Sequence, residues 1–240
     1  MKVIVNNEKV LSEMIANDFI EVINKKPNAV LGLATGTSPL GVYANLAKAN
    51  KEGKVSFKDV TTFNLDEYVG LDGTHNQSYR YFMNENLFNH IDIDKKRTYV
   101  LLGVGDYVSF MNKYDQMILD AGGIDIQILG IGSDGHIAFN EPGTPLDSLT
   151  HETELTEQTI KDNSRLFNDI SEVPTRAVTM GLESIMRARK IVLIATGKNK
   201  ANAIKGLLKG PITPDMPCSI LQRHPDVTIY CDEEAYSLVK

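Results

Sequence analysis

The stretch LGLATGTSPL at residues 31–40 predicts a strand that turns directly into a helix. Apolar residues dominate its first half, glycine and hydroxyl residues follow, and Pro39 suits the first helical position with Ser38 as the N-cap. Free backbone N–H groups and the positive end of the helix dipole make such a helix start able to bind an anion. The spacing matches neither a Walker A loop nor a dinucleotide fingerprint. An ordinary capped turn is the competing explanation.

The same alternation of strand and helix continues along the chain. Short β-branched runs predict strands at 2–5, 29–34, 60–65, 98–102, 124–131, 176–180, 190–195 and 227–231. Amphipathic runs predict helices at 8–24, 38–51, 77–88, 106–121, 182–187, 198–208 and 219–222. We therefore expect an α/β fold with a doubly wound, mostly parallel sheet and helices on both faces. Ligands of such sheets bind beyond the carboxyl ends of the strands, so the motifs that follow these strands should meet in one crevice.

Composition limits the size of the fold and its partners. A chain of 240 residues, 42% hydrophobic, can bury a large core, and we expect residues 1–240 to form a single domain. Residues 151–172, rich in Thr, Glu, Asp and Asn, predict either a mobile lid or a solvated excursion, and composition leaves both open. The formal net charge of −6 and the scattered basic residues argue against nucleic acid as a partner.

The cellular location follows from three features of the sequence. Cys218 and Cys231 are too few for a disulfide scaffold, which favours reduced thiols. The N-terminus turns polar too soon for a signal peptide, and no apolar stretch is long enough to span a membrane. We expect a soluble cytoplasmic protein without a membrane partner.

The stretch LGIGSDGHIAFNEPG at residues 129–143 contains the densest set of reactive side chains. Asp134 and Glu141 can orient and charge-stabilise the imidazole of His136, which titrates near neutrality, so the three residues can transfer a proton. A metal site is the alternative, but Asp-x-His with one Glu and no second His or Cys is a weak ligand pattern. We therefore expect proton transfer and no metal; a polar turn with a capping aspartate is the purely structural explanation.

Three further motifs carry charges or donors. TFNLDEYVGL at residues 62–71 places two carboxylates after a strand, and one of them can be a general base, although a helix cap or an exposed acidic loop is the commoner explanation of such a pair. Arg165, in NSRLF at 163–167, and Lys200, in TGKNK at 196–200, can bind a phosphate. Simple exposure to solvent is the alternative for each cation.

These motifs together resemble the glucosamine-6-phosphate deaminases, and the resemblance covers nearly the whole chain. Enzymes of this family convert glucosamine 6-phosphate and water into fructose 6-phosphate and ammonium. NLDEY at residues 64–68 combined with DGHIAFNEP at 134–142 carries the resemblance most specifically. It implies the NagB/RpiA-like, Rossmann-type form of the fold, a small phosphorylated sugar as substrate, and no cofactor, because the reaction needs acids and bases but no redox group.

The resemblance also implies a role for each motif. Asp66 matches the base that moves the proton at C2, and His136 matches the group that assists opening of the sugar ring. Asp134 and Glu141 match the carboxylate partners of that histidine. The residues implied at the phosphate are Ser38, Arg165 and Lys200, with the backbone of Gly36 and Thr37 nearby.

Two other functions fit the same scaffold. The 6-phosphogluconolactonases also contain Asp-Gly-His but typically continue with Ser-Leu-Phe-Pro, whereas this chain continues with IAFNEP at 137–142. A non-catalytic phosphosugar-binding sensor is disfavoured because every catalytic position is retained. Longer, allosterically activated deaminases carry Arg-x-Lys-Thr where this chain has HETE at 151–154, so we expect a form without that regulation, as a monomer or small homo-oligomer.

Overall fold

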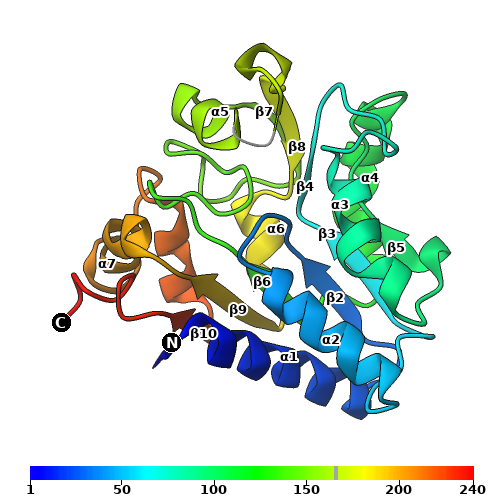
Figure 1. Cartoon of the computed structure of the whole chain (residues 1–240). Helices are drawn as coiled ribbons and strands as arrows, with labels where there is room; N and C mark the ends of the chain where they lie inside the picture. Colours follow the sequence, from blue (N-terminus) through cyan, green and yellow to red (C-terminus); the bar gives the residue numbers. More distant parts are fainter. Residues whose placement is uncertain (165–166) are drawn as a thin grey trace.

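The computed structural model describes residues 1–164 and 167–240 of the chain. Within that part, seven parallel strands form the central sheet in the order β1-β10-β9-β6-β2-β3-β5 (Figure 1). The strands are β1 (Lys2–Val5), β2 (Val30–Leu33), β3 (Thr61–Asn64), β5 (Thr98–Tyr99), β6 (Ile126–Leu129), β9 (Lys190–Ala195) and β10 (Val227–Cys231). The expected α/β architecture with a parallel sheet is confirmed.

Helices connect these strands on both faces of the sheet. The α-helices are α1 (Glu8–Lys25), α2 (Leu40–Lys51), α3 (Tyr79–Asn86), α4 (Tyr107–Asp120), α5 (Glu157–Asn163), α6 (Leu182–Met186) and α7 (Ala201–Lys209). Short 3₁₀ helices are η1 (Phe88–His90), η2 (Lys95–Arg97), η4 (Ile170–Glu172), η5 (Lys198–Lys200) and η6 (Pro217–Arg223). The chain moves one way along the sheet from β1 to β5 and returns from β6 to β10. Because such crossovers are right-handed, the two halves place their helices on opposite faces.

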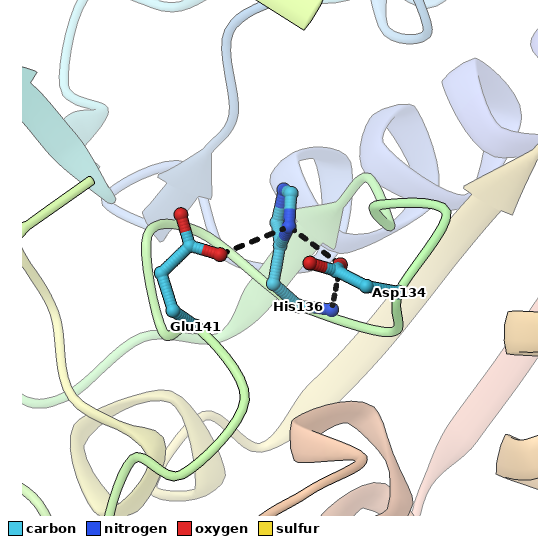
Figure 2. Close-up of side chains that lie close together, drawn as sticks. All are labelled: Asp134, His136 and Glu141. Carbon is cyan, nitrogen blue, oxygen red and sulfur yellow. Dashed lines mark hydrogen bonds and ion pairs between the residues drawn. The ribbon is translucent and has the colours of Figure 1, made fainter. Parts of the chain in front are cut away.

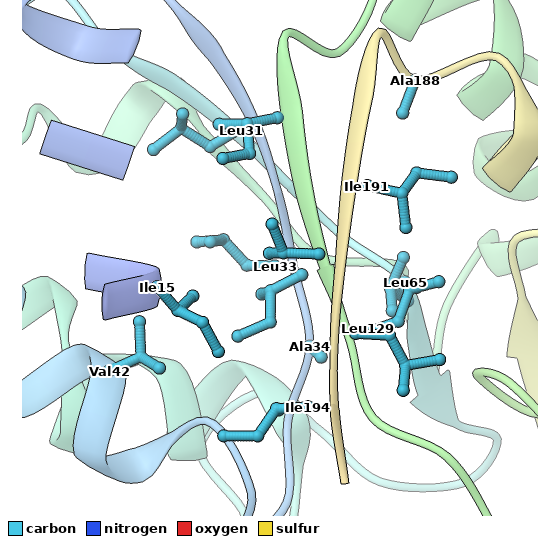
Figure 3. Packing of buried hydrophobic residues seen from close by; sticks show 14 of the residues in the cluster. Ile15, Leu31, Leu33, Ala34, Val42, Leu65, Leu129, Ala188, Ile191 and Ile194 are labelled. Atoms are coloured by element: carbon cyan, nitrogen blue, oxygen red, sulfur yellow. The ribbon is translucent and has the colours of Figure 1, made fainter. Parts of the chain in front are cut away.

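The core lies between the sheet and these helices. All four residues of β2 are buried, as expected for a parallel strand covered on both faces. Ile15 of α1 and Val42 of α2 pack on the same side as Leu31 and Leu33 of β2 (Figure 3). These apolar positions hold β2 in the middle of the sheet, and the loop that follows β2 is therefore anchored at its start.

A second, antiparallel sheet corrects the sequence-based expectation. Its strands pair in the order β4 (Asp66–Tyr68), β8 (Arg176–Thr179) and β7 (His151–Glu154). The strand expected at 176–180 therefore belongs to this sheet, and two of its neighbours were not predicted. Both are short and polar, so their extended form comes from pairing with β8 and has no signal in residue type.

The described part of residues 151–172 contains regular elements and a buried side chain. It holds β7, the helix α5 and the 3₁₀ helix η4, and Leu155 between the first two is buried. The side chain of Thr156 caps α5 by accepting a hydrogen bond from the N–H of Thr159. Motion of this segment as a lid stays a prediction.

The start of α2 differs from the prediction by a small but consequential shift. The helix begins at Leu40, Pro39 stands at the N-cap position, and no side chain caps the helix there. Ser38 is therefore not the N-cap, because the chain turns once more at 36–39 before the helix starts. This leaves Ser38 to face the cavity described below.

Two smaller expectations can be compared with the structure. Cys218 and Cys231 are both free and buried. In the part of the chain that the structure describes, the helices are too short or too polar to cross a lipid bilayer.

Candidate active site

A cavity of about 210 Å³ opens where loops leave the carboxyl ends of β2, β3, β6 and β9. Parallel strands end at one edge of a sheet, which is why motifs far apart in sequence meet here. Residues that the sequence analysis singled out and that line the cavity are Gly36, Thr37, Ser38, Asp66, His136 and Lys200. The expected crevice is therefore present.

The loop after β6 brings the imidazole of His136 against its own backbone. A Cβ atom added at Gly132 would lie 2.3 Å from two atoms of the His136 ring, so only glycine leaves room for the ring there. The N–H of Gly132 donates to the carbonyl of His136 (2.9 Å). The N–H of His136 in turn donates to Oδ1 of Asp134 (3.1 Å). These contacts close the loop into a compact turn.

The ring of His136 stands between two carboxylates (Figure 2). Its Nδ1 lies 2.8 Å from Oδ1 of Asp134 and 3.7 Å from Oε2 of Glu141. His136 lines the cavity, whereas neither carboxylate is among the lining residues of the described chain. Partial burial acts to raise the pKa of Asp134, but the hydrogen bond and charge of the His136 ring outweigh it and hold that pKa at about 2. Asp134 is thus a fixed anion behind the imidazole.

The next turn, at residues 137–141, is held by the small antiparallel sheet. The side-chain amide of Asn140 donates to the carbonyls of Ile137 (2.9 Å) and Met180 (2.8 Å). The N–H of Phe139 donates to Oγ1 of Thr179, in β8 (3.1 Å). Ala138, which lines the cavity, has a φ of 51°, and it is the one non-glycine residue of the described chain in the left-handed region. A residue held in that conformation costs about 1–2 kcal/mol, which these contacts must offset.

The structure separates the two carboxylates of the Asp66–Glu67 pair. Asp66 is 6% exposed and lines the cavity. Glu67 instead accepts hydrogen bonds from the N–H groups of Tyr79 (2.9 Å) and Arg80 (3.0 Å) and so caps the start of α3. Of the explanations left open by the sequence, the helix cap applies to Glu67. Asp66 lies in the cavity, and its role as a general base stays a prediction.

Burial changes the acidity of both side chains. Loss of solvent raises the pKa of Asp66 to about 8, and the nearby charge of Glu67 acts in the same direction. Burial also raises the pKa of Glu67, to about 7, against the backbone hydrogen bonds that favour its ionised form. An aspartate with a raised pKa, facing a cavity, is a stronger base than an ordinary aspartate once it is ionised.

Groups suited to a phosphate also line the cavity. Gly36 has a φ of 92°, which glycine adopts without strain, and it leads into Thr37 and Ser38. Lys200, at the end of η5, lines the same cavity. Arg165, also predicted at the phosphate, lies outside the residues that the structure describes.

Three further residues line the cavity but have no clear signal in the sequence. Tyr79 comes from the first turn of α3, and Thr159 and Asn163 come from α5. Thr159 also donates a hydrogen bond to Oε1 of Glu141 (2.6 Å). The partners are 18 residues apart, so no local pattern could have paired them. The one signal at Tyr79 is an aromatic residue near the start of a predicted helix.

The segment at residues 134–141 offers side chains that could bind a metal ion. One ligand atom each from Asp134, His136 and Glu141 lies within 4.8 Å of the others, which is close enough for a shared divalent cation. However, Nδ1 of His136 already lies at hydrogen-bond distance from Asp134. The absence of a metal therefore stays a prediction.

Comparisons with known proteins place this geometry in context. Residues 7–230 match the family described as "Glucosamine-6-phosphate isomerases/6-phosphogluconolactonase". The chain is 49% identical over 239 residues to the glucosamine-6-phosphate deaminase of Clostridium perfringens, covering 99% of each protein. It is 52% identical over 241 residues to the protein of the same name from Clostridium tetani, covering 100% of each.

Solved structures give the same picture. One, described as a monomeric glucosamine-6-phosphate deaminase, is 43% identical, has a TM-score of 0.97, and covers 99% of this chain and 100% of its own. The 6-phosphogluconolactonase of Trypanosoma brucei has a TM-score of 0.79 over 100% of this chain and 98% of its own. At 19% identity, that second likeness shows a common fold only.

Proposed function

The chain belongs to the family of glucosamine-6-phosphate isomerases and 6-phosphogluconolactonases, and on that basis we propose that it is a glucosamine-6-phosphate deaminase. It converts glucosamine 6-phosphate and water into fructose 6-phosphate and ammonium. The relatives that are about half identical over their whole length carry that name. The observation that carries the proposal is that the carboxyl of Asp66 and the imidazole of His136 line one cavity.

The reaction requires several proton transfers in sequence. The sugar ring opens, the proton at C2 leaves and a proton is added at C1, and the resulting imine at C2 is hydrolysed to release ammonium. We assign the first step to His136, which moves a proton at the ring oxygen or the hydroxyl at C1. Asp134 and Glu141 keep the imidazole oriented and stabilise its charged form.

Asp66 is the proposed base at C2. Its raised pKa gives the ionised carboxylate a high proton affinity, which suits abstraction of a weakly acidic C–H. It is also buried, so few water molecules compete for that proton.

The phosphate of the substrate is proposed to bind at Gly36, Thr37, Ser38 and Lys200, with Arg165 as a further ligand. The hydroxyl and cationic groups among the lining residues support this assignment. Binding energy from the phosphate positions the sugar against Asp66 and His136, so unphosphorylated glucosamine should lose kcat as well as affinity. Equal kcat values for the two sugars would show that the phosphate site lies elsewhere.

Regulation by an anionic effector is not part of the proposal. The segment HETE at 151–154 forms β7, where Glu152 pairs with Arg176 (2.6 Å) and accepts a hydrogen bond from Tyr107 (3.2 Å). A second glutamate, Glu154, is exposed beside it and would repel an anion. We therefore propose hyperbolic kinetics without activation by N-acetylglucosamine 6-phosphate.

The broader setting of the protein is also a proposal. We propose that residues 1–240 form one catalytic domain and that residues 151–172 can move as a lid. We also propose a cytoplasmic location, no metal or cofactor, and no membrane partner. The net charge of −6 supports the further proposal that the protein has no nucleic-acid partner. A monomer or small homo-oligomer is supported by the structural neighbour described as monomeric.

One assay separates the proposed function from its alternatives. Purified protein is mixed with glucosamine 6-phosphate, and ammonium and fructose 6-phosphate are measured; a parallel reaction contains 6-phosphogluconolactone. The expected result is stoichiometric release of both deaminase products. Lactone hydrolysis without ammonium would identify a lactonase, and binding of the sugar phosphate without turnover would identify a sensor.

A further inference from the structure

Helix α5 contacts Glu141, one of the two carboxylates beside His136. Oγ1 of Thr159, a buried residue, donates to Oε1 of Glu141 over 2.6 Å. The N–H of Thr156, the N-cap of the same helix, lies 3.5 Å from that oxygen. One oxygen of Glu141 is thus fixed by the first turn of α5.

Holding one oxygen of a planar carboxylate fixes the direction of the other. Oε2 of Glu141 lies 3.7 Å from Nδ1 of His136, is buried, and has no hydrogen-bond partner among the described residues. The backbone of Glu141 is held separately, since both the N–H and Oγ1 of Thr144 donate to its carbonyl (3.0 and 2.7 Å). The orientation of the side chain, as distinct from the backbone, therefore depends on Thr159.

We infer that Thr159 is a positioning residue for the reaction, and this inference rests on the proposed deaminase function. The hydroxyl of Thr159 turns Glu141 so that its second oxygen faces the imidazole of His136. Thr159 also lines the cavity, as does Asn163 one turn further along α5. Helix α5, which lies outside the parallel sheet, therefore contacts both the cavity and Glu141.

A purely structural role for Thr159 would give a different result. Its N–H and hydroxyl contact Oγ1 of Thr156 (3.2 and 3.1 Å), so a Thr159 variant with only a structural effect would loosen α5 and lower stability. It would leave the carboxylate of Glu141 in place and the kcat of the folded protein unchanged. The test must therefore measure more than stability.

The experiment compares Thr159→Val, which removes the hydroxyl at nearly constant volume, with Thr159→Ser, which keeps it. The matched control is Thr62→Val, because the buried hydroxyl of Thr62 in β3 has no hydrogen-bond partner among the described residues. We expect Thr159→Val to lower kcat about tenfold or more, the worth of one hydrogen bond to a charged group, with KM within about threefold. Thr159→Ser should restore kcat to within about twofold.

A crystal structure of the Thr159→Val protein makes the test independent of activity. It should show Oε2 of Glu141 moved away from its distance of 3.7 Å to Nδ1 of His136. An unmoved carboxylate, normal kcat in Thr159→Val, or failure of Thr159→Ser to rescue would each overturn the inference. Wild-type protein that releases no ammonium would instead refute the proposed function, while the crystal structure would still decide whether Thr159 positions Glu141.

Discussion

Asp66 and Asp134 belong to one site but lie in opposite surroundings. Asp66 lies where the parallel sheet meets the small antiparallel sheet, is almost fully buried, and has Glu67 as its neighbour. Asp134 lies in a glycine-rich turn, half-buried and 2.8 Å from the ring of His136. Burial raises the pKa of Asp66 to about 8, whereas the His136 ring holds the pKa of Asp134 at about 2.

This difference supports the proposal that two identical side chains have different tasks. Surroundings that push the acidities of two carboxyls apart assign one to proton exchange and the other to a fixed charge. The pKa of Asp134 is so low that it stays ionised at any pH near neutrality. Of the two aspartates, Asp66 is the one whose pKa lies close enough to neutrality for it to take up and release a proton. Five experiments examine this difference, in order of decreasing size of the expected effect.

Asp66→Asn should lower kcat by about 10²–10⁴-fold, because the amide keeps the shape of the carboxyl but cannot accept the C2 proton. Steady-state release of ammonium measures it. Asp72→Asn is the matched control, since that exposed carboxylate accepts its hydrogen bonds from Thr74 at the surface. Near-normal turnover of Asp66→Asn would remove Asp66 from the role of base.

Single variants of Asp134, His136 and Glu141 should lower kcat by about 10–10³-fold and change KM less. The variants are Asp134→Asn, His136→Gln and Glu141→Gln. If the three residues act on one proton, as proposed, each double variant should lose less than the product of the two single losses. Strictly multiplicative losses in the same assay would argue for independent roles.

The pH dependence of kcat/KM reports on the base in the free enzyme. Because only the ionised form of Asp66 can take a proton, kcat/KM should rise about tenfold per unit between pH 6 and pH 8 and then level off. Asp134, with a pKa of about 2, should add no step in this range. An acidic limb centred below pH 5 would mean that Asp66 titrates as an ordinary aspartate.

Thermal unfolding tests the same shift without substrate. Between about pH 4 and pH 8 the folded protein keeps on Asp66 a proton that the unfolded chain has released, so this contribution to stability is complete at low pH and is lost as pH rises towards 8. Asp66→Asn should therefore melt near the wild type at pH 5 and higher at pH 8, by about 2–4 °C for each kcal/mol relieved. Equal differences in Tm at both pH values would contradict the raised pKa.

Dialysis against a chelator should leave the activity unchanged, which is the smallest effect expected in this series. Asp134, His136 and Glu141 are close enough for a divalent cation, but the proposed chemistry needs only proton transfer. Ammonium release should survive dialysis against EDTA unchanged. Loss of activity that one divalent ion restores would place a metal in the turn and change the meaning of the low pKa of Asp134.

Much of this arrangement could be predicted from local sequence. Apolar β-branched runs mark the strands of the parallel sheet, and glycine-rich turns after them mark the edge where the cavity lies. The small antiparallel sheet could not be predicted, because β4 and β7 are polar and become strands only by pairing with β8. Ser38 was wrongly predicted as an N-cap because the extra turn before α2 depends on the backbone conformation at Gly36.

The site was predictable in part for the same physical reasons. Motifs of adjacent residues, such as those around Asp66 and His136, could be recognised because their members are neighbours in the sequence. Residue type alone could not separate Asp66 from Glu67. The family resemblance favoured Asp66, and the structure adds the position of α3, whose N–H groups bind Glu67. The contact of Thr159 with Glu141 joins two separate turns, and only the folded chain creates it.

The contact of the imidazole with Gly132 has a consequence for mutational tolerance. A residue with no side chain is here as restricted as any reactive one, since every substitution would push the ring of His136 out of its place. In a saturation library of residues 129–143 selected for growth on the amino sugar, position 132 should accept no replacement, alanine included. Its neighbour Gly130, whose added Cβ would meet no atom within 4 Å, should accept small ones.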